Sequence, residues 1–121
     1  MAVSAIVFVD DVSASLAFYE AVLRTRRDHL DDDGSYGELD RVGFAANWHA
    51  EHNLNFPFRA NASSEDPAGF ALYFVVEDVD GTFDRAVESG ADAVWAPEDK
   101  PWGRAAMFRD LDGVLVQLGD A

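Results

Sequence analysis

The side chains that could carry chemistry are few, and the most suggestive spacing among them is a pair of histidines. His49 and His52 lie three residues apart around Ala50-Glu51, and two imidazoles at this spacing can bind a metal from one face of a helix. The segment follows an apolar stretch and lies among polar residues, which favours a solvent-facing loop. His29 stands in an acidic run that ends at Asp33; neighbouring carboxylates favour the imidazolium, and therefore a surface position.

Other reactive constellations are missing. The chain has no cysteine, which excludes disulfides, thiolate metal sites and a cysteine nucleophile. No motif places a serine with a histidine and a carboxylate, so a serine hydrolase is not indicated. The sequence does offer an aromatic side chain that could stack on a ligand. Trp102 lies in Pro101-Trp102-Gly103-Arg104, where little regular structure could bury it. We therefore expect Trp102 to contact a ligand, whereas for Trp95, just before Pro97, core packing is favoured.

Further candidates come from alternating segments. Trp48 ends an apolar stretch that predicts a strand, and its indole N–H could meet a polar ligand group. Glu38 and Asp40 alternate on a predicted strand and could face a binding site, although charged runs are usually solvated. In the segment 53–58, polar and apolar residues alternate, so Phe56 could line the site or pack in a core.

Two arginines bracket another predicted strand. Arg104 and Arg109 could bind a carboxylate or phosphate with their forked guanidinium groups. The alternative is a structural pair with Asp110 or Asp112, and the sequence favours this alternative slightly.

Charge narrows the range of partners. Nine basic and 23 acidic side chains give the 121-residue chain a net charge of −14, which argues against nucleic acid and anionic membranes. A hydrophobic fraction of 49% predicts a folded domain. No apolar run approaches the roughly 20 residues of a membrane span, and the amino-terminal segment lacks the basic residues of a signal peptide, so a cytoplasmic location is expected.

An internal repeat predicts the elements that position these residues. The segment 7–16 aligns with 74–83, each being an apolar run, an acidic pair, a valine and a polar stretch. Each copy predicts a buried strand followed by a helix, with Asp11 and Asp78 at or near the helix N-caps. Gly90 should end the second helix.

Three short strands are predicted after each helix, which makes each half a βαβββ module. Their approximate ranges are Arg26–Leu30, Tyr36–Arg41, Gly43–Trp48, Ala93–Ala96, Arg104–Arg109 and Val114–Leu118. The modules would span 1–60 and 70–121, joined by a polar linker at 61–69. The predicted class is α+β, in a single domain.

Three segments, 7–23, 77–91 and 101–118, resemble the vicinal oxygen chelate superfamily, which contains glyoxalases, bleomycin-resistance proteins and ring-cleaving dioxygenases. The resemblance implies strands that curl around a cleft and pairing into a homodimer, with domain swapping left open. Because the superfamily includes lyases, isomerases, oxygenases and non-catalytic drug binders, the fold does not decide the function.

Metal-dependent members have His and Glu at four strand positions, which correspond here to Ser4, Ala45, Ala71 and Gln117. None is His or Glu, so we expect no metal or other cofactor and lean against catalysis. The resemblance is strongest in type to bleomycin-resistance-like binders. It implies that Trp102 and Tyr36 clamp a planar aromatic ligand.

The favoured function is therefore sequestration of a small aromatic molecule, for which the acidic chain would suit a basic group. The predicted contacts are Trp102, Tyr36, Trp48, Glu38, Phe56, Arg104 and Gln117. Two alternatives stay open. One is a metal-dependent lyase, isomerase or dioxygenase whose displaced ligands come from His49, His52 or Glu38. The other is a carrier for a biosynthetic intermediate.

Overall fold

The computed structural model describes residues 1–49 and 69–121, and they fall into two compact units. The first unit comprises Met1–Glu20 and the described part of Arg24–Ala60. The second comprises Ala21–Leu23 and the described part of Asn61–Ala121. Each unit contains one four-stranded sheet.

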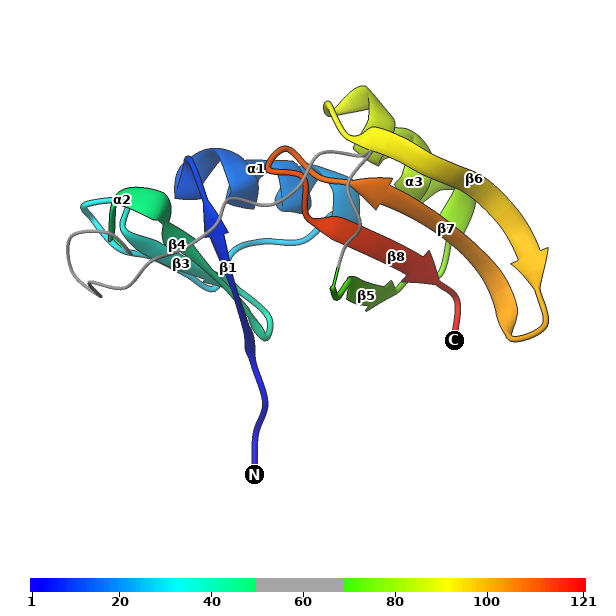
Figure 1. Cartoon of the computed structure of the whole chain (residues 1–121), viewed down its shortest axis with the longest axis horizontal. Helices are drawn as coiled ribbons and strands as arrows, with labels where there is room; N and C mark the ends of the chain where they lie inside the picture. Colours follow the sequence, from blue (N-terminus) through cyan, green and yellow to red (C-terminus); the bar gives the residue numbers. More distant parts are fainter. Residues whose placement is uncertain (50–68) are drawn as a thin grey trace. The chain divides into compact units, whose positions relative to one another are not determined.

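The first sheet has the strand order β1-β4-β3-β2, and β1, β3 and β4 are labelled in Figure 1. Its strands are β1 (Ala5–Val9), β2 (His29–Leu30), β3 (Tyr36–Leu39) and β4 (Val42–Ala46). β1 runs parallel to β4, while β3 is antiparallel to both β4 and β2. A parallel pair needs a crossover, and α1 (Val12–Leu23) follows β1 directly.

α1 begins and packs as the repeat predicts. Asp11 is its N-cap, and the carboxylate accepts a hydrogen bond of 3.0 Å from the Ala14 N–H. The helix approaches the sheet so closely at Gly37 that a Cβ there would lie 2.7 Å from Leu16 Cδ1. The rings of Tyr19 and Phe44 are 5.4 Å apart between centroids and both are almost fully buried. α1 therefore covers one face of the first sheet.

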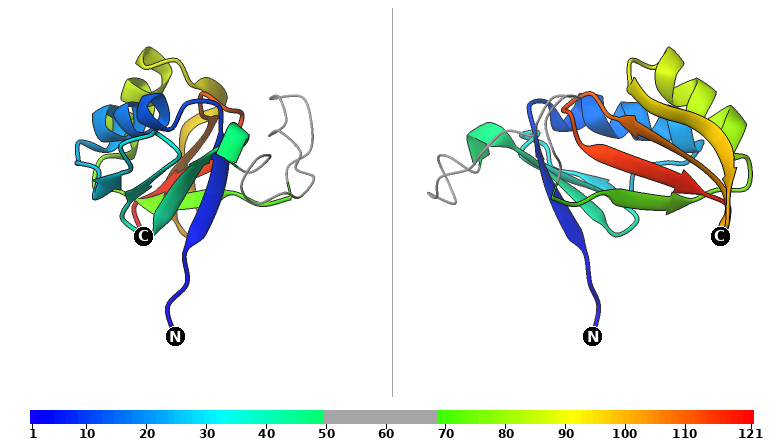
Figure 2. Two further views of the ribbon diagram at one scale, coloured as in Figure 1. Left: turned by 90° about the vertical axis from the view of Figure 1, so that its left-hand side faces the viewer. Right: turned by 45° about the vertical axis from the view of Figure 1, so that its right-hand side comes forward.

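The second sheet repeats this arrangement with the order β5-β8-β7-β6. Its strands are β5 (Leu72–Val75), β6 (Asp92–Lys100), β7 (Gly103–Arg109) and β8 (Leu115–Gly119). β5 is parallel to β8, and the other pairs are antiparallel. α3 (Val79–Glu88) follows β5 and lies against β6, β7 and β8 (Figure 2).

The core of the second unit lies under α3. Phe83 and Ala86 of the helix are buried, as are Phe108 of β7 and Leu118 of β8. Asp78 is the N-cap and accepts a hydrogen bond of 3.0 Å from Gly81 N–H. The helix ends at Glu88, and Gly90 follows with φ of 108°, a conformation that glycine adopts without strain.

The α+β class and the two βαβββ modules are confirmed, but several predicted boundaries are wrong. Trp48 does not end a strand, because β4 stops at Ala46 and Trp48 lies in the short helix α2 (Asn47–His49). β2 has two residues, where the sequence predicted a strand from Arg26 to Leu30.

β6 is longer than predicted and continues through Pro97. It is an edge strand with register shifts on both sides of Trp95. Edge strands and bulges tolerate proline because the missing N–H is not needed by a neighbour.

The predicted linker 61–69 lies outside the described residues except for Gly69, and so do Phe56 and His52. In the parts of the chain that are described, no helix is long and apolar enough to cross a membrane.

Candidate functional site: the open faces of the two sheets

Each sheet has one face covered by its helix and an opposite face, which we call the open face. In the first sheet, Val7, Phe44 and Gly37 are cross-strand partners on the side of α1. Because successive side chains alternate between faces, the intervening residues form the open face. They make two rows across the strands, Phe8–Ala45–Tyr36 and Ile6–Gly43–Glu38–His29.

Tyr36 and Glu38, both predicted ligand contacts, therefore share the open face of the first sheet. The Tyr36 ring lies across Gly43 of the neighbouring strand, where a Cβ would be 2.5 Å from the phenol oxygen. Burial raises the pKa of the Tyr36 phenol, and the negative charges of Glu38 and Asp31 raise it further. Tyr36 thus presents a half-buried, neutral aromatic ring with an acidic neighbour.

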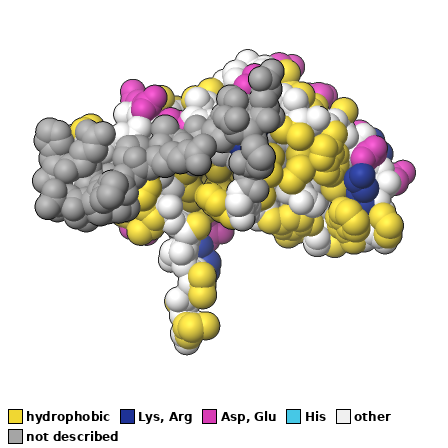
Figure 3. Space-filling model, in the orientation of Figure 1, with side chains coloured by type: hydrophobic (Ala, Val, Ile, Leu, Met, Phe, Trp, Pro, Cys, Tyr) yellow, Lys and Arg dark blue, Asp and Glu magenta, His cyan; other side chains and the backbone are white. Residues whose placement is uncertain are grey.

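The open face of the second sheet is richer in large side chains. One row across all four strands is Tyr73–Gln117–Met107–Trp95, and the next is Val75–Gly119–Ala105–Glu98. Tyr73 and Val75 are 44% and 64% exposed. Figure 3 shows hydrophobic side chains gathered over the second unit.

Tyr73 is held in place on this face. Its hydroxyl donates a hydrogen bond to the Ala121 carbonyl. The ring lies across Gly119, where a Cβ would be 1.9 Å from the phenol oxygen and 2.7 Å from Cζ. As with Tyr36 and Gly43, a glycine on the central strand gives a tyrosine room to lie along the sheet.

Trp95 differs from its predicted core position. It is half-buried, pairs with Met107, and lies in the same row as Gln117 on the open face. The Nζ atom of Lys100 lies 4.7 Å from the centroid of the Trp95 ring. The sequence did not reveal this because the two register shifts in β6 break the simple alternation that would have assigned its faces.

Sequence reasoning also passed over Tyr73 and Met107. A signal for Tyr73 existed, since it stands two residues after Ala71, which corresponds to a ligand position of the metal-dependent members, and alternate residues of a strand share a face. For Met107 no such signal existed, because its place in the row follows from its pairing with Gln117 on β8.

Of the four positions that metal-dependent members use for ligands, two lie within strands of this chain and two directly before strands. Ala45 and Gln117 lie on the open faces by register. Ser4 and Ala71 directly precede β1 and β5 and continue the alternation of Ile6 and Tyr73. Together they offer one hydroxyl and one amide oxygen, which do not fit the imidazole and carboxylate ligands of a tight divalent site. Within residues 1–49 and 69–121, no group of three or more His, Asp or Glu side chains could hold a metal ion.

Trp102 and Trp48 are exposed and lie outside the two rows described above. Trp102 is in the two-residue turn that joins Lys100 of β6 to Gly103 of β7, and it is 54% exposed. The turn uses Gly103 at φ of 138°, a value that favours glycine. Trp48, in α2, is 42% exposed. A ligand contact for either residue stays a prediction.

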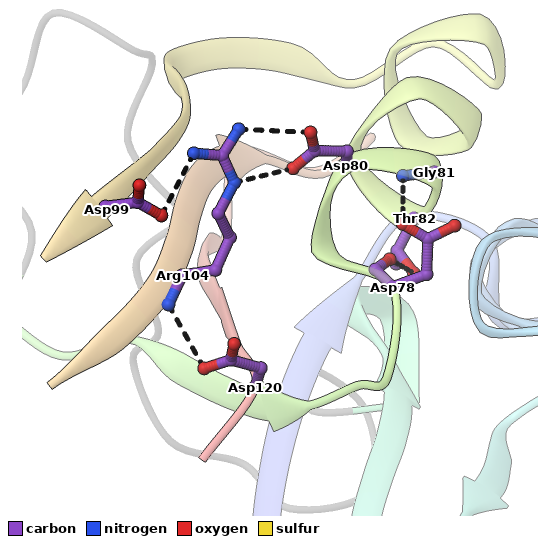
Figure 4. Close-up of polar contacts among 7 residues, drawn as sticks. All are labelled: Asp78, Asp80, Gly81, Thr82, Asp99, Arg104 and Asp120. Atoms are coloured by element: carbon purple, nitrogen blue, oxygen red, sulfur yellow. Dashed lines mark hydrogen bonds and ion pairs between the residues drawn. The ribbon is translucent and has the colours of Figure 1, made fainter.

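Arg104 lies on the helix side of the second sheet, bound by carboxylates (Figure 4). Its guanidinium donates to both oxygens of Asp80 in α3, at 2.9 and 3.0 Å, and to Asp99 of β6 at 3.2 Å. The backbone N–H of Arg104 donates to Asp120 at 3.1 Å. Arg104 thus ties the β6–β7 hairpin to α3, with partners other than the two aspartates considered from the sequence.

The charged side chains of the turn between β7 and β8 also bind other groups of the protein. Asp110 is 5% exposed, and its Oδ1 accepts hydrogen bonds of 2.9 Å from the N–H groups of Asp112 and Val114. Arg109 donates to the Gly113 carbonyl at 2.7 Å. These residues close the turn that brings β8, and with it Gln117, between β5 and β7.

Two βαβββ modules, each with an open sheet face, define a class of fold shared by enzymes and binding proteins. The model of the Glyoxalase/Bleomycin resistance protein/Dioxygenase superfamily matches residues 2–118. The chain therefore belongs to this superfamily.

Solved structures show the same fold. A glyoxalase-related enzyme from Fulvimarina pelagi is 15% identical with a TM-score of 0.78, over 98% of this chain and 87% of the other. TioX from Micromonospora sp. ML1 is 22% identical with a TM-score of 0.69, over 98% and 94% of the two chains. The fosfomycin resistance protein FosX from Mesorhizobium loti is 16% identical with a TM-score of 0.66, over 100% and 92%. No curated protein matches the sequence.

Proposed function

We propose that this protein binds a planar aromatic small molecule that carries a basic group, and that it holds the molecule without transforming it. The observation that carries the proposal is the row Tyr73–Gln117–Met107–Trp95 on the open face of the second sheet. It combines two aromatic rings and a flexible thioether with one amide, the mixture of apolar area and few polar groups that small-molecule sites use.

The chemistry of the remaining positions supports binding over catalysis. The four positions that correspond to metal ligands provide no imidazole or carboxylate, and Gln117 supplies an uncharged amide that can donate and accept hydrogen bonds. Such a group can orient a heteroaromatic ring but is a poor general acid or base. Sequestration as a means of antibiotic resistance or self-protection is the biological role that follows from this proposal.

The other predicted contacts fit the same ligand class. Tyr36 offers a ring and Glu38 a negative charge on the open face of the first sheet. In the proposal, Trp102 adds a stacking surface from the exposed hairpin turn, and Trp48 contributes from α2. A homodimer in the cytoplasm is part of the same proposal.

Tryptophan fluorescence tests the proposal directly, since the chain has three tryptophans. Titration with bleomycin and with the intercalator ethidium should quench the emission in a saturable way. Trp95→Leu should remove most of the quenching if the second sheet binds the ligand, and Trp48→Leu should remove the smaller share that the proposal gives to α2. No quenching by any planar aromatic compound, with normal drug sensitivity of cells that express the protein, would contradict the proposal.

A second candidate is a metal-dependent lyase, isomerase or dioxygenase with displaced ligands. The observation that favours it is the proximity of two donors on the first open face, where Glu38 and His29 are cross-strand partners. His49, in α2, was a further candidate. Metal analysis of protein purified without chelator discriminates, because stoichiometric zinc, iron, nickel or manganese that Glu38→Gln abolishes would favour the enzyme. A carrier role for a biosynthetic intermediate would share the binding site and differ in the compound that copurifies.

A further inference from the structure

The only lysine of the chain lies over an aromatic ring on the open face of the second sheet. Lys100 Nζ is 4.7 Å from the centroid of Trp95, within the range of a cation–π interaction. Lys100 also forms an ion pair with Glu98. Its side chain is 29% exposed, compared with 52% for Glu98. Part of the ammonium group's water is therefore replaced by the ring and the carboxylate.

The strand register places all three groups on one face. Trp95, Glu98 and Lys100 pair with Met107, Ala105 and Gly103, which alternate along β7. Met107 and Ala105 in turn pair with Gln117 and Gly119 on β8.

The neighbouring residues confirm the assignment from the other side. Asp99 and Arg104 are cross-strand partners on the side of α3, where the Arg104 guanidinium donates hydrogen bonds to both Asp80 of the helix and Asp99 (Figure 4). The two residues that flank Asp99 along β6, Glu98 and Lys100, therefore face away from the helix.

The register shifts in β6 make this arrangement possible. A shift on each side of Trp95 changes the alternation of the strand, so that Trp95 and Glu98 face the same side although they are three residues apart. The Lys100 side chain then reaches back over the indole from the end of the strand.

We propose that Lys100 is an exchangeable internal cation, which occupies on the Trp95 ring the position that the basic group of a ligand takes in the complex. This inference rests on the proposed function. The face of an indole attracts a cation through its quadrupole, and it does so whether the cation belongs to the protein or to the ligand. A ligand cation that displaces Lys100 meets Glu98, whose carboxylate becomes its counterion.

Lys100 is then the residue that determines charge selectivity at this site. For a cationic ligand, the cost of displacing the ammonium group lowers the affinity, and the displaced Lys100 adds like-charge repulsion. A neutral ring that stacks elsewhere on the Tyr73–Trp95 row neither displaces the ammonium group nor is repelled by its charge. An anionic ligand gains from Lys100 where it stands.

Three probes of similar shape separate these effects: N-methylquinolinium as the cation, quinoline at pH 8 as the neutral ring, and quinoline-4-carboxylate as the anion. Lys100→Met keeps much of the side-chain volume and removes the charge. We expect this variant to bind the cation about 3- to 10-fold more tightly, to bind quinoline within about 2-fold of the wild type, and to bind the anion more weakly. Lys100→Arg should keep the wild-type pattern, because guanidinium also stacks on indole.

A second readout reports on the lysine itself. Reductive methylation with ¹³C-formaldehyde labels the N-terminal amine and Lys100, the single lysine. The methyl resonances that are missing from Lys100→Met belong to Lys100, and they should be shifted upfield by the ring current of Trp95. Trp95→Leu should remove this shift, and saturating N-methylquinolinium should reduce it in the wild type while quinoline should not.

The outcomes distinguish the inference from the function on which it rests. If the probes bind but Lys100→Met leaves the ratio of cation affinity to quinoline affinity unchanged, the ligand cation does not displace Lys100 from the Trp95 ring. The inference is then wrong, and the proposed binding function stands. If none of the three probes binds either protein, both fail. Methyl resonances that are unaffected by Trp95→Leu would overturn the contact itself.

Discussion

The position of Tyr73 can be tested through the glycine beneath it. Substituting Gly119→Ala would place a Cβ 1.9 Å from the phenol oxygen, 2.7 Å from Cζ and 3.2 Å from Cε1 of Tyr73, and these are the three nearest atoms. All three belong to the outer part of one ring. The substitution should therefore act through Tyr73 and displace it from the open face.

The change in the free energy of unfolding depends on how the overlap between the new Cβ and the Tyr73 ring is relieved. Tyr73 is 44% exposed, so the ring can rotate toward solvent without distorting the core. The protein then loses the hydrogen bond to the Ala121 carbonyl and some ring contact, which together destabilise it by about 1 kcal/mol. Without the ring, Gly→Ala in a strand should instead stabilise by about 0.4–1 kcal/mol, because the unfolded chain loses freedom.

A double-mutant cycle measures this sign change. Urea unfolding of the wild type, Gly119→Ala, Tyr73→Ala and the double variant should give a coupling free energy of about 1.5 kcal/mol. In the Tyr73→Ala background, Gly119→Ala should be neutral or stabilising. Equal destabilisation in both backgrounds would refute the reasoning, since the new Cβ would then be opposed by something other than Tyr73.

Three further predictions concern single groups. Asp78→Ala should lower the free energy of unfolding by about 1 kcal/mol in urea titrations, because α3 loses its N-cap, while Asp78→Asn should retain most of the stability. Arg104 holds the pKa of Asp80 below its usual range through their hydrogen bonds. The pair therefore stabilises the fold at a pH above the pKa that Asp80 has in the unfolded chain, and this stabilisation is lost as the pH falls through the lower pKa of Asp80 in the folded protein. The stability difference between wild type and Arg104→Gln should accordingly shrink as the pH is lowered below about 4; a difference that stays constant would contradict the pairing. Glu38→Gln should lower the pKa of Tyr36 part of the way toward 10, since burial, the larger cause, remains. Phenolate absorbance in a background with the other two tyrosines changed to phenylalanine would measure it, and an unchanged pKa would show that Glu38 does not act on the phenol.

The repeated motif made the overall architecture predictable. An apolar run followed by an acidic pair predicts a strand and a capped helix, and Asp11 and Asp78 cap the two helices. These signals are local, because an N-cap depends on three or four consecutive residues. The order of elements along each module followed from the strand and turn signals, whereas the order of strands within each sheet is known only from the structure.

The candidate site was less predictable because its faces depend on register. A single bulge reverses the face of every later residue in a strand, and β6 has two register shifts. For this reason the sequence favours core packing for Trp95 and does not place it on the open face. For Arg104 the sequence slightly favours a structural pair over a ligand contact, but it does not identify the partner, because Asp80 in α3 lies 24 residues away, a separation at which no local pattern indicates a pair.

Net charge is a weaker guide to the ligand than the distribution of that charge. Several of the acids have structural partners on the helix side or in turns: Asp78 caps α3, Asp80 and Asp99 bind Arg104, and Asp110 closes a turn. Those carboxylates add to the total of −14 without lying on an open face. On the second open face, Glu98 is paired with the single lysine, so the local charge there is balanced. A preference for basic ligands must therefore depend on whether Lys100 leaves the Trp95 ring. Measuring ligand affinity for the wild type and Lys100→Met at low and high salt separates two effects. The local exchange is screened little by salt, whereas the long-range attraction by the whole chain decays over about 8 Å at physiological ionic strength.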